Sequence, residues 1–247
     1  MIEIQRKKSK EKYVILFFII LIFCTTFFIM YKYHVEGEKN IPFNITKFLV
    51  VSSAKTENIE LNENIYEANV IQKNDLYIAI EKNKEHSKED AIKKITINNF
   101  KIVEDSKKGN VKIYRTSLGT NNYEYIENYE IKDSIEYTGA KETNLKTENM
   151  TISNQGGVIE LSVILNDLGK VTYNEDDNIL SDGRLLNRLQ ITSEEIRKTI
   201  TFDMYIELVG GNTFKTTISL EMPTGDIVND GVNTNEIDLS KLVFKRV

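Results

Sequence analysis

Hydrophobic residues follow two different patterns along the chain, and each pattern predicts a different kind of element. Residues 13–30 carry no charged side chain, and five basic residues precede them. At about 1.5 Å of rise per residue, eighteen helical residues span about 27 Å, close to the hydrocarbon thickness of a bilayer. We therefore expect a single transmembrane helix over residues 13–31, with tyrosines at the membrane interface.

From residue 43 onward, apolar residues mostly alternate with polar ones, as in strands that bury one face. The alternation is clearest in residues 200–208 and 214–222, and Val209-Gly210-Gly211-Asn212 between them predicts a tight turn and an antiparallel hairpin. Nine further strands are expected at 45–52, 66–71, 76–81, 95–103, 111–116, 134–138, 158–165, 170–173 and 242–245. This spacing predicts a mainly β fold, an antiparallel β-sandwich of jelly-roll or immunoglobulin-like type.

The pattern also divides the chain into segments. We expect a basic tail at residues 1–12, the anchor at 13–31, a polar connector at 32–42 and a β-sandwich domain at 43–247. Residues 139–150 are polar and linker-like, so the domain has a possible split there. A single unit is favoured over two because no internal repeat is visible.

Two short segments within the domain carry helix-start chemistry. Residues 87–90 read Ser-Lys-Glu-Asp and residues 192–195 read Thr-Ser-Glu-Glu, each just before apolar residues. A hydroxyl followed by a carboxylate three residues later is the capping-box pattern. Each segment is expected to form one or two helical turns.

The distribution of basic residues predicts the orientation of the anchor. Five Lys or Arg precede the span, against three in the twenty residues that follow it. The positive-inside rule then places the N-terminus in the cytoplasm and the C-terminal domain outside it, at a cell membrane. A cleaved signal peptide and a lipoprotein are the alternatives. Both are disfavoured, because the apolar run is long and Phe23, rather than a small residue, precedes Cys24.

Charge and cysteine content narrow the function classes. Residues 1–34 carry a net charge of +4, so the total of −5 leaves −9 for the rest of the chain. An acidic domain without a basic stripe argues against nucleic-acid binding. Cys24 is the single cysteine and lies within the expected span, so the domain has no disulfide. An extracytoplasmic domain without disulfides fits a bacterial surface better than a eukaryotic secretory route.

Catalytic chemistry is poorly represented, and no cofactor is indicated. The two histidines, His34 and His86, lie at the membrane exit and in a charged run, so each is most simply a solvated group. Ser52 and Lys55 have the S-x-x-K spacing of some serine acylases, but the companion motifs are missing. The end of a strand is the better interpretation of that segment.

One acidic segment contains the candidate metal ligands. Asn174, Asp176, Asn178 and Asp182 form the densest group of oxygen ligands and are candidates for a loop-held calcium site. The segment fails the helix-loop-helix template, because Ile179 stands where that template needs glycine. The alternative is a solvated acidic turn.

A group of tyrosines supplies the candidate binding residues. Tyr123, Tyr125, Tyr129 and Tyr137 lie within fifteen residues of one another. Exposed tyrosines stack on sugar rings or anchor protein interfaces. The alternative is that several of them pack in the core between neighbouring strands.

These observations favour a non-enzymatic, membrane-anchored β domain with a binding or structural role in a bacterial envelope. Its expected partners are the membrane, through the single-pass anchor, and another envelope protein or the cell-wall glycan. The alternative is an envelope glycan hydrolase that uses paired carboxylates. A third hypothesis is a structural subunit whose anchor contributes an interface within a membrane complex.

Overall fold

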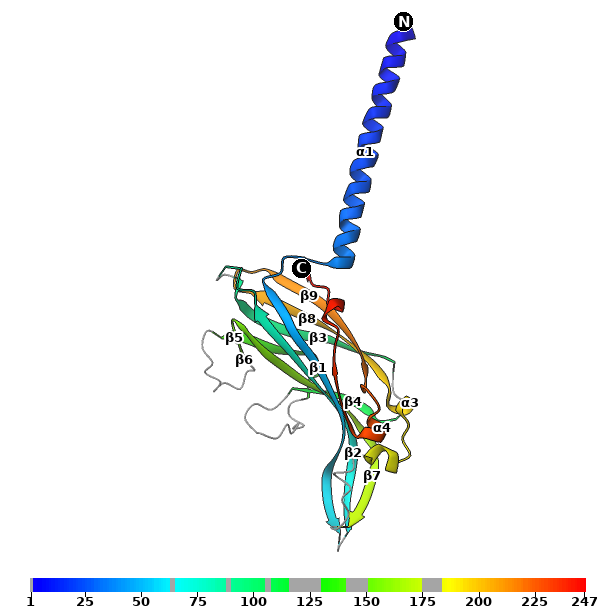
Figure 1. Cartoon of the computed structure of the whole chain (residues 1–247), viewed down its shortest axis with the longest axis vertical. Helices are drawn as coiled ribbons and strands as arrows, with labels where there is room; N and C mark the ends of the chain where they lie inside the picture. The colour runs from blue at the N-terminus through cyan, green and yellow to red at the C-terminus, as the bar shows by residue number, and fades with distance from the viewer. Residues whose placement is uncertain are drawn as a thin grey trace.

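The computed structural model describes residues 2–62, 65–87, 90–104, 108–115, 130–140, 151–174 and 184–247. Helix α1 (Ile2–Glu36) projects alone from one end of the β portion (Figure 1). Its segment from Lys12 to Glu36 is long and apolar enough to cross a membrane, and none of it is buried against the rest of the protein. The helix extends further than the expected span, because it continues five residues past Tyr31 before it ends.

The β portion has two antiparallel groups of strands. The first has the order β10-β1-β2-β7, with β4 on the other side of β7, and the second has the order β5-β3-β8-β9-β11. Short β6 connects them by pairing parallel with β5 and antiparallel with β7. The bounds are β1 (Phe43–Asn62), β2 (Ile65–Lys82), β3 (Ile92–Glu104), β4 (Asn110–Arg115), β5 (Ser134–Ala140), β6 (Thr151–Ser153), β7 (Gly156–Asn174), β8 (Lys198–Leu208), β9 (Thr213–Met222), β10 (Val232–Glu236) and β11 (Lys245–Arg246).

The main hydrophobic core draws on both groups of strands. Alternate residues of β8 from Ile200 to Leu208 are buried, and the β8–β9 hairpin forms as predicted. Strands from either side of residues 139–150 share this core, with Phe48, Leu76 and Leu161 from the first group and Ile95, Phe202 and Ile206 from the second. The fold is therefore mainly β with two antiparallel sheets. Its assignment to the jelly-roll or immunoglobulin type stays a prediction.

Two strands are longer than predicted. The expected strands 66–71 and 76–81 form one strand, β2, and the expected strands 158–165 and 170–173 form one strand, β7. The polar residues 72–75 do not make a turn, because their side chains find partners inside the sheet. The irregular stretch of β7 is a bulge. On β2, Val70 and Gln72 are two residues apart, whereas their partners on β7, Gly169 and Leu165, are four residues apart. A bulge bends a strand without ending it.

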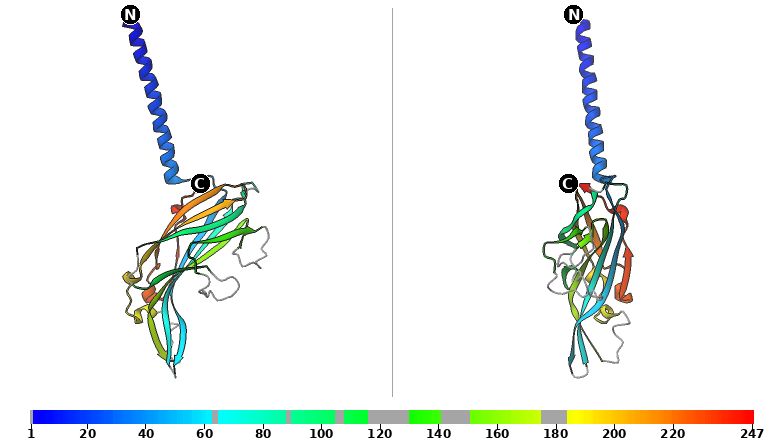
Figure 2. Two further views of the ribbon diagram at one scale, coloured as in Figure 1. Left: turned by 180° about the vertical axis from the view of Figure 1, so that it is seen from behind. Right: turned by 90° about the vertical axis from the view of Figure 1, so that its left-hand side faces the viewer.

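Beyond the bulge, β1, β2 and β7 continue as a three-stranded extension at the end of the molecule opposite α1 (Figures 1 and 2). We call residues 57–62, 65–67 and 172–174 the distal ribbon. Its base packs on a second small core under three short helices, α2 (Leu185–Arg188), α3 (Ser193–Ile196) and α4 (Ile227–Asp230).

The predicted helix start at residues 192–195 is confirmed. Thr192 and Glu195 form a capping box at α3, with the Thr192 amide donating to Glu195 Oε2 at 2.8 Å. At the other expected start, the Ser87 amide donates to Asp90 Oδ2, and residues 88–89 lie outside the described residues. Strands β6 and β10, helices α2 and α4 and the 3-10 turn η3 (Leu239–Lys241) were not predicted.

Candidate functional site

The junction between α1 and the β portion is a tightly fitted turn. The helix ends at Glu36, and Gly37 adopts a left-handed conformation with φ of 71° while its amide donates to the Tyr33 carbonyl at 2.9 Å. A Cβ atom at residue 37 would lie 2.4 Å from the Phe244 carbonyl oxygen. Both the conformation and the space therefore require glycine at this position.

The C-terminal segment closes this junction. The Glu38 amide donates to the Phe244 carbonyl at 2.8 Å, and the Arg246 amide donates to the Tyr33 hydroxyl at 3.0 Å. The Arg246 guanidinium also donates to Glu38 at 3.4 Å. We call residues 33–38 with 243–247 the elbow. It joins the helix end to β11 and, through β11, to the second sheet.

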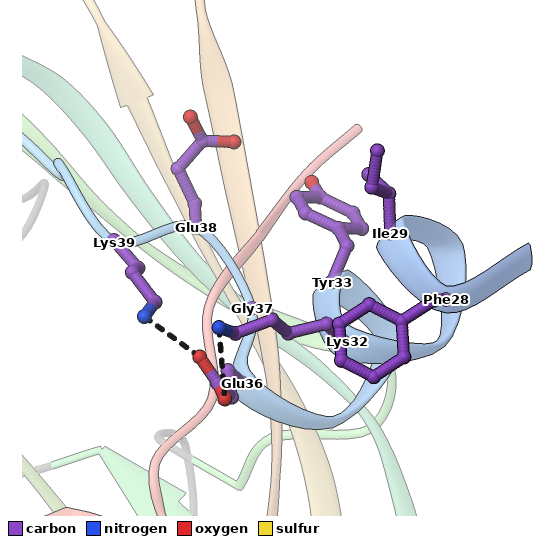
Figure 3. Close-up of a pocket in the computed structure, with 8 residues that line it drawn as sticks. All are labelled: Phe28, Ile29, Lys32, Tyr33, Glu36, Gly37, Glu38 and Lys39. Atoms are coloured by element: carbon purple, nitrogen blue, oxygen red, sulfur yellow. Dashed lines mark ion pairs between the residues drawn. The ribbon is translucent and has the colours of Figure 1, made fainter. Parts of the chain in front are cut away.

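A carboxylate between two lysines marks the outer side of the elbow (Figure 3). Glu36 lies 2.8 Å from Lys39 and 4.0 Å from Lys32. The two lysines therefore balance the negative charge of Glu36 at the end of the helix. The adjoining hollow of about 460 Å³ is also lined by Phe28 and Ile29, so apolar and charged side chains meet along one face of the helix.

At the opposite end of the molecule, the distal ribbon presents apolar side chains to solvent. Leu61 pairs with Tyr66, and Tyr66 pairs with Tyr173, so these three side chains form a row across the three strands on one face. The two tyrosine rings stack with centroids 5.3 Å apart. Leu61 is 58% exposed, and Ile59 and Ile65 are about as exposed. Apolar side chains gathered in this way are typical of an interaction surface.

The outer edges of the distal ribbon carry no paired strand among the residues that the structure describes. Strand β10 pairs with β1 only over residues 49–53, and β4 pairs with β7 only over residues 161–166. Within the described part of the chain, no strand pairs with the outer edges of β1 and β7 beyond these positions. At residues 58–61 of β1 and 172–173 of β7, such edges offer backbone N–H and C=O groups to an added strand.

A polar cluster lies in the middle of the first sheet, where β2 was expected to break. Ser52 donates to Asn74 Oδ1 at 2.7 Å, and Gln72 donates to the same oxygen at 2.7 Å. Lys198 reaches Gln72 Oε1 at 3.3 Å. These groups satisfy one another without a base beside the Ser52 hydroxyl, so the cluster supports a structural role. Lys55 is three residues from Ser52 on the same strand, so alternation directs the two side chains to opposite faces.

The two buried carboxylates of the described residues do not face each other. Asp75 on β2 is bonded to Lys73 at 3.0 Å and accepts from Ser162, whereas Asp203 on β8 is bonded to Lys215 at 2.8 Å. The two acids belong to different sheets and each has its own lysine. Asp75 and Asp203 therefore do not form an acid pair of the kind that a glycosidase needs.

The four candidate tyrosines have different outcomes. Tyr137 is 3% exposed and its hydroxyl donates to the Glu160 carbonyl, so this ring packs in the core and is not a surface binding residue. Burial raises its pKa above the ordinary value. Tyr123, Tyr125 and Tyr129 lie outside the described residues. The stacked Tyr66 and Tyr173 were missed, because their pairing depends on strand register, which the sequence does not reveal.

The candidate metal ligands remain a prediction. Asn174 is exposed at the end of β7, and Asp176, Asn178 and Asp182 lie outside the described residues. Among the residues that the structure describes, no group of three or more His, Cys, Asp or Glu side chains is placed to hold a metal ion.

Comparison with known proteins adds little to this picture. No family model and no curated protein sequence matches the chain. A solved structure titled "Biofilm associated protein - BSP domain" is similar at 16% identity with a TM-score of 0.20. The match covers 82% of this chain and 30% of that protein, so the chain spans under a third of its length. At this TM-score the likeness carries no argument about fold or function.

Proposed function

We propose that the protein is a membrane-anchored, extracytoplasmic β-sandwich domain of a bacterial envelope, and that its distal ribbon binds another envelope protein. The observation that carries this proposal is the distal ribbon at the end opposite α1 (Figure 2), with a row made of exposed Leu61 and the half-buried Tyr66 and Tyr173. A helix anchored in the membrane and fixed at the elbow would hold that row away from the bilayer, where a partner has access to it.

The anchoring role of α1 rests on its surface. Its apolar side chains from Tyr13 to Met30 are exposed, and burying them in hydrocarbon removes that area from water at about 25 cal/mol per Å². The basic flank supports an N-terminus in the cytoplasm. The span contains no glycine and no charge, which fits an anchor without transport chemistry of its own.

The chemistry of the distal ribbon favours a protein partner over a glycan. Sugar sites combine aromatic faces with polar groups, whereas here Leu61 adds aliphatic surface beside the stacked tyrosines, and exposed Ile65 adds it on the opposite face of the ribbon. The open edges of β1 and β7 also favour a polypeptide, because only a strand satisfies a row of backbone donors and acceptors. The wall glycan is therefore the competing outcome of the test.

The test is site-specific photo-crosslinking of the full chain in its own membrane. A crosslinker placed at Leu61 should capture one protein reproducibly, and the variant Ile59→Ser with Ile65→Ser should reduce the yield about tenfold. Val103→Ser is the matched control, because Val103 is 62% exposed on β3, outside the distal ribbon. Capture of glycan alone, or an equal loss in the control, would refute a protein partner at the ribbon.

A further inference from the structure

A second hollow lies beside the elbow, on the face where α1 meets β9 and the C-terminal segment. It has a volume of about 390 Å³. Its lining includes His34 from α1, Lys215 and Thr217 from β9, Lys241 from η3, and Lys245 from β11. The fold therefore brings Lys215 together with Lys241 and Lys245, two lysines of the C-terminal segment, around one opening.

The position of this hollow along α1 places it at a definite depth. If the apolar run ending at Met30 fills the hydrocarbon, His34 is four residues further on, about 6 Å beyond the hydrocarbon edge. The headgroup layer on each side of a bilayer is about 5 to 7 Å thick. His34 and Lys245, whose Nζ lies 3.3 Å from His34 Nδ1, are then level with the lipid phosphates.

The acids near the hollow leave positive charge in it. Asp203 is bonded to Lys215 at 2.8 Å, Glu38 to Arg246, and Glu36 to Lys39. Asp238 lies three residues before Lys241, accepts from the Ser240 amide at 3.0 Å, and attracts Lys241 electrostatically without forming an ion pair with it. Within the described part of the chain, neither Lys241 nor Lys245 forms an ion pair with a carboxylate. Two cationic groups are thus available to an anion.

From this geometry we infer that the elbow hollow binds the phosphate of an anionic phospholipid headgroup. The lipid belongs to the leaflet that faces the β portion of the protein. The inference rests on the proposed anchoring of α1 and adds a lipid partner to it. Lys241 and Lys245 supply the charge, whereas the Thr217 hydroxyl on the same lining already donates to Asp203. The bound lipid would hold the base of the domain against the membrane surface.

The experiment uses the full chain in nanodiscs made from equal parts of phosphatidylglycerol and phosphatidylcholine. Native mass spectrometry of the released protein measures the ratio of the two lipids that stay bound. Wild type should retain phosphatidylglycerol in excess over the bulk ratio. The variant Lys241→Gln with Lys245→Gln should lose that excess, by about fivefold for each lysine removed. Lys101→Gln, an exposed lysine on β3, is the matched control and should keep it.

A soluble competitor separates the lipid from a free anion. Excess glycerol 1-phosphate should leave the bound phosphatidylglycerol in place, because it lacks the acyl chains that fix the headgroup beside α1. Displacement by the competitor, an equal ratio of lipids in wild type, or an unchanged ratio in the double variant would each overturn the inference.

The readouts also separate this inference from the proposed anchor. Incorporation of the protein into nanodiscs reports on α1 alone, because the lysine variants leave the span intact. Full incorporation with no lipid preference overturns only the elbow site. Failure to incorporate overturns the anchor, and the elbow site with it.

Discussion

At the scale of single residues, Asp203 is a carboxylate of the second sheet that is bound by three side chains. It accepts from Thr217 at 2.6 Å and Asn99 at 2.8 Å and is bonded to Lys215 at 2.8 Å. Burial raises its pKa, but the bonds from Lys215, Thr217 and Asn99 outweigh burial, so the pKa lies below the ordinary value. The ionised form therefore stabilises the fold.

We expect Asp203→Asn to lower the free energy of unfolding by about 2 kcal/mol at pH 7. A carboxyl group with a lowered folded-state pKa adds stability above its ordinary pKa, about 3.9, and that stability is lost as the pH falls through the folded-state value. The difference in the free energy of unfolding between wild type and variant should therefore become smaller below about pH 4. Urea unfolding of the full chain in detergent from pH 7 to pH 3 measures this. A gap that stayed constant with pH would contradict the ionic role.

Tyr137 gives a second expectation at this scale. Its buried hydroxyl donates to the Glu160 carbonyl across the sheets. Tyr137→Phe removes the donor and keeps the ring, so stability should fall by about 1 kcal/mol. The control is Tyr66→Phe on the distal ribbon, which keeps the ring stack and should change stability little. Thermal unfolding of the two variants side by side tests the difference, and equal effects would contradict it.

The position of Tyr137 was already contained in the sequence. Ile135 and Tyr137 alternate with Ser134, Glu136 and Thr138, which places the ring on the same face as a core isoleucine. Grouping tyrosines by proximity in sequence concealed this. Tyr66 and Tyr173, by contrast, are 107 residues apart and meet only through the pairing of β2 with β7. No local pattern carries that information.

At the scale of elements, the elbow depends on one glycine. Gly37→Ala would place its Cβ 2.4 Å from the Phe244 carbonyl oxygen and 2.7 Å from a Val243 methyl group, so the C-terminal segment must move away. We expect faster hydrogen exchange at the Glu38 and Arg246 amides, whose bonds cross this contact. Exchange by mass spectrometry on the full chain measures this directly.

Gly211→Ala is the matched control for this change. Gly211 also has a positive φ, 89°, but no atom lies within 4 Å of the added Cβ. Both variants therefore carry the same kind of backbone strain, and only Gly37→Ala carries a steric collision. If the two variants raised exchange at Glu38 and Arg246 equally, the elbow would not depend on close packing at residue 37.

The elements that were predicted correctly are those whose apolar period is uninterrupted. The β8–β9 hairpin has regular alternation and a glycine turn, and it forms as expected. The run Gln72-Lys73-Asn74-Asp75 resembles a turn in composition, yet β2 continues through it. Its polar side chains are satisfied by Ser52, Lys198 and Ser162, which lie on three other strands. A residue's tertiary partners decide such cases, and they cannot be read from a single strand.

At the scale of the whole molecule, the positive charge around the elbow comes from separate parts of the chain. Lys32 and Lys39 lie close to the apolar run in the sequence. Lys215, Lys241 and Lys245 do not, and the folded chain brings them to the end of α1. The anchor and the β class were therefore predictable from local patterns. The elbow hollow and the distal ribbon were not, because both are products of long-range pairing.

The orientation of the whole molecule gives a last expectation. Asn212 is next to Thr213, whose carbonyl accepts from the Val247 amide, so it lies beside the elbow. Glu60 lies on the distal ribbon, seventeen residues along β1 from Phe43, which is up to about 58 Å of extended strand. Since Cys24 is the chain's single cysteine, a Cys24→Ser background allows one fluorophore to be attached at either position.

In vesicles with spin-labelled headgroups, a fluorophore on Asn212→Cys should be quenched strongly and one on Glu60→Cys hardly at all. Vesicles without the spin label give the reference intensity for each position. Equal quenching at both positions would mean that the domain lies flat on the bilayer, and the distal ribbon would then face lipid. Quenching at Asn212 alone leaves the ribbon free, which is the condition that a partner binding there requires.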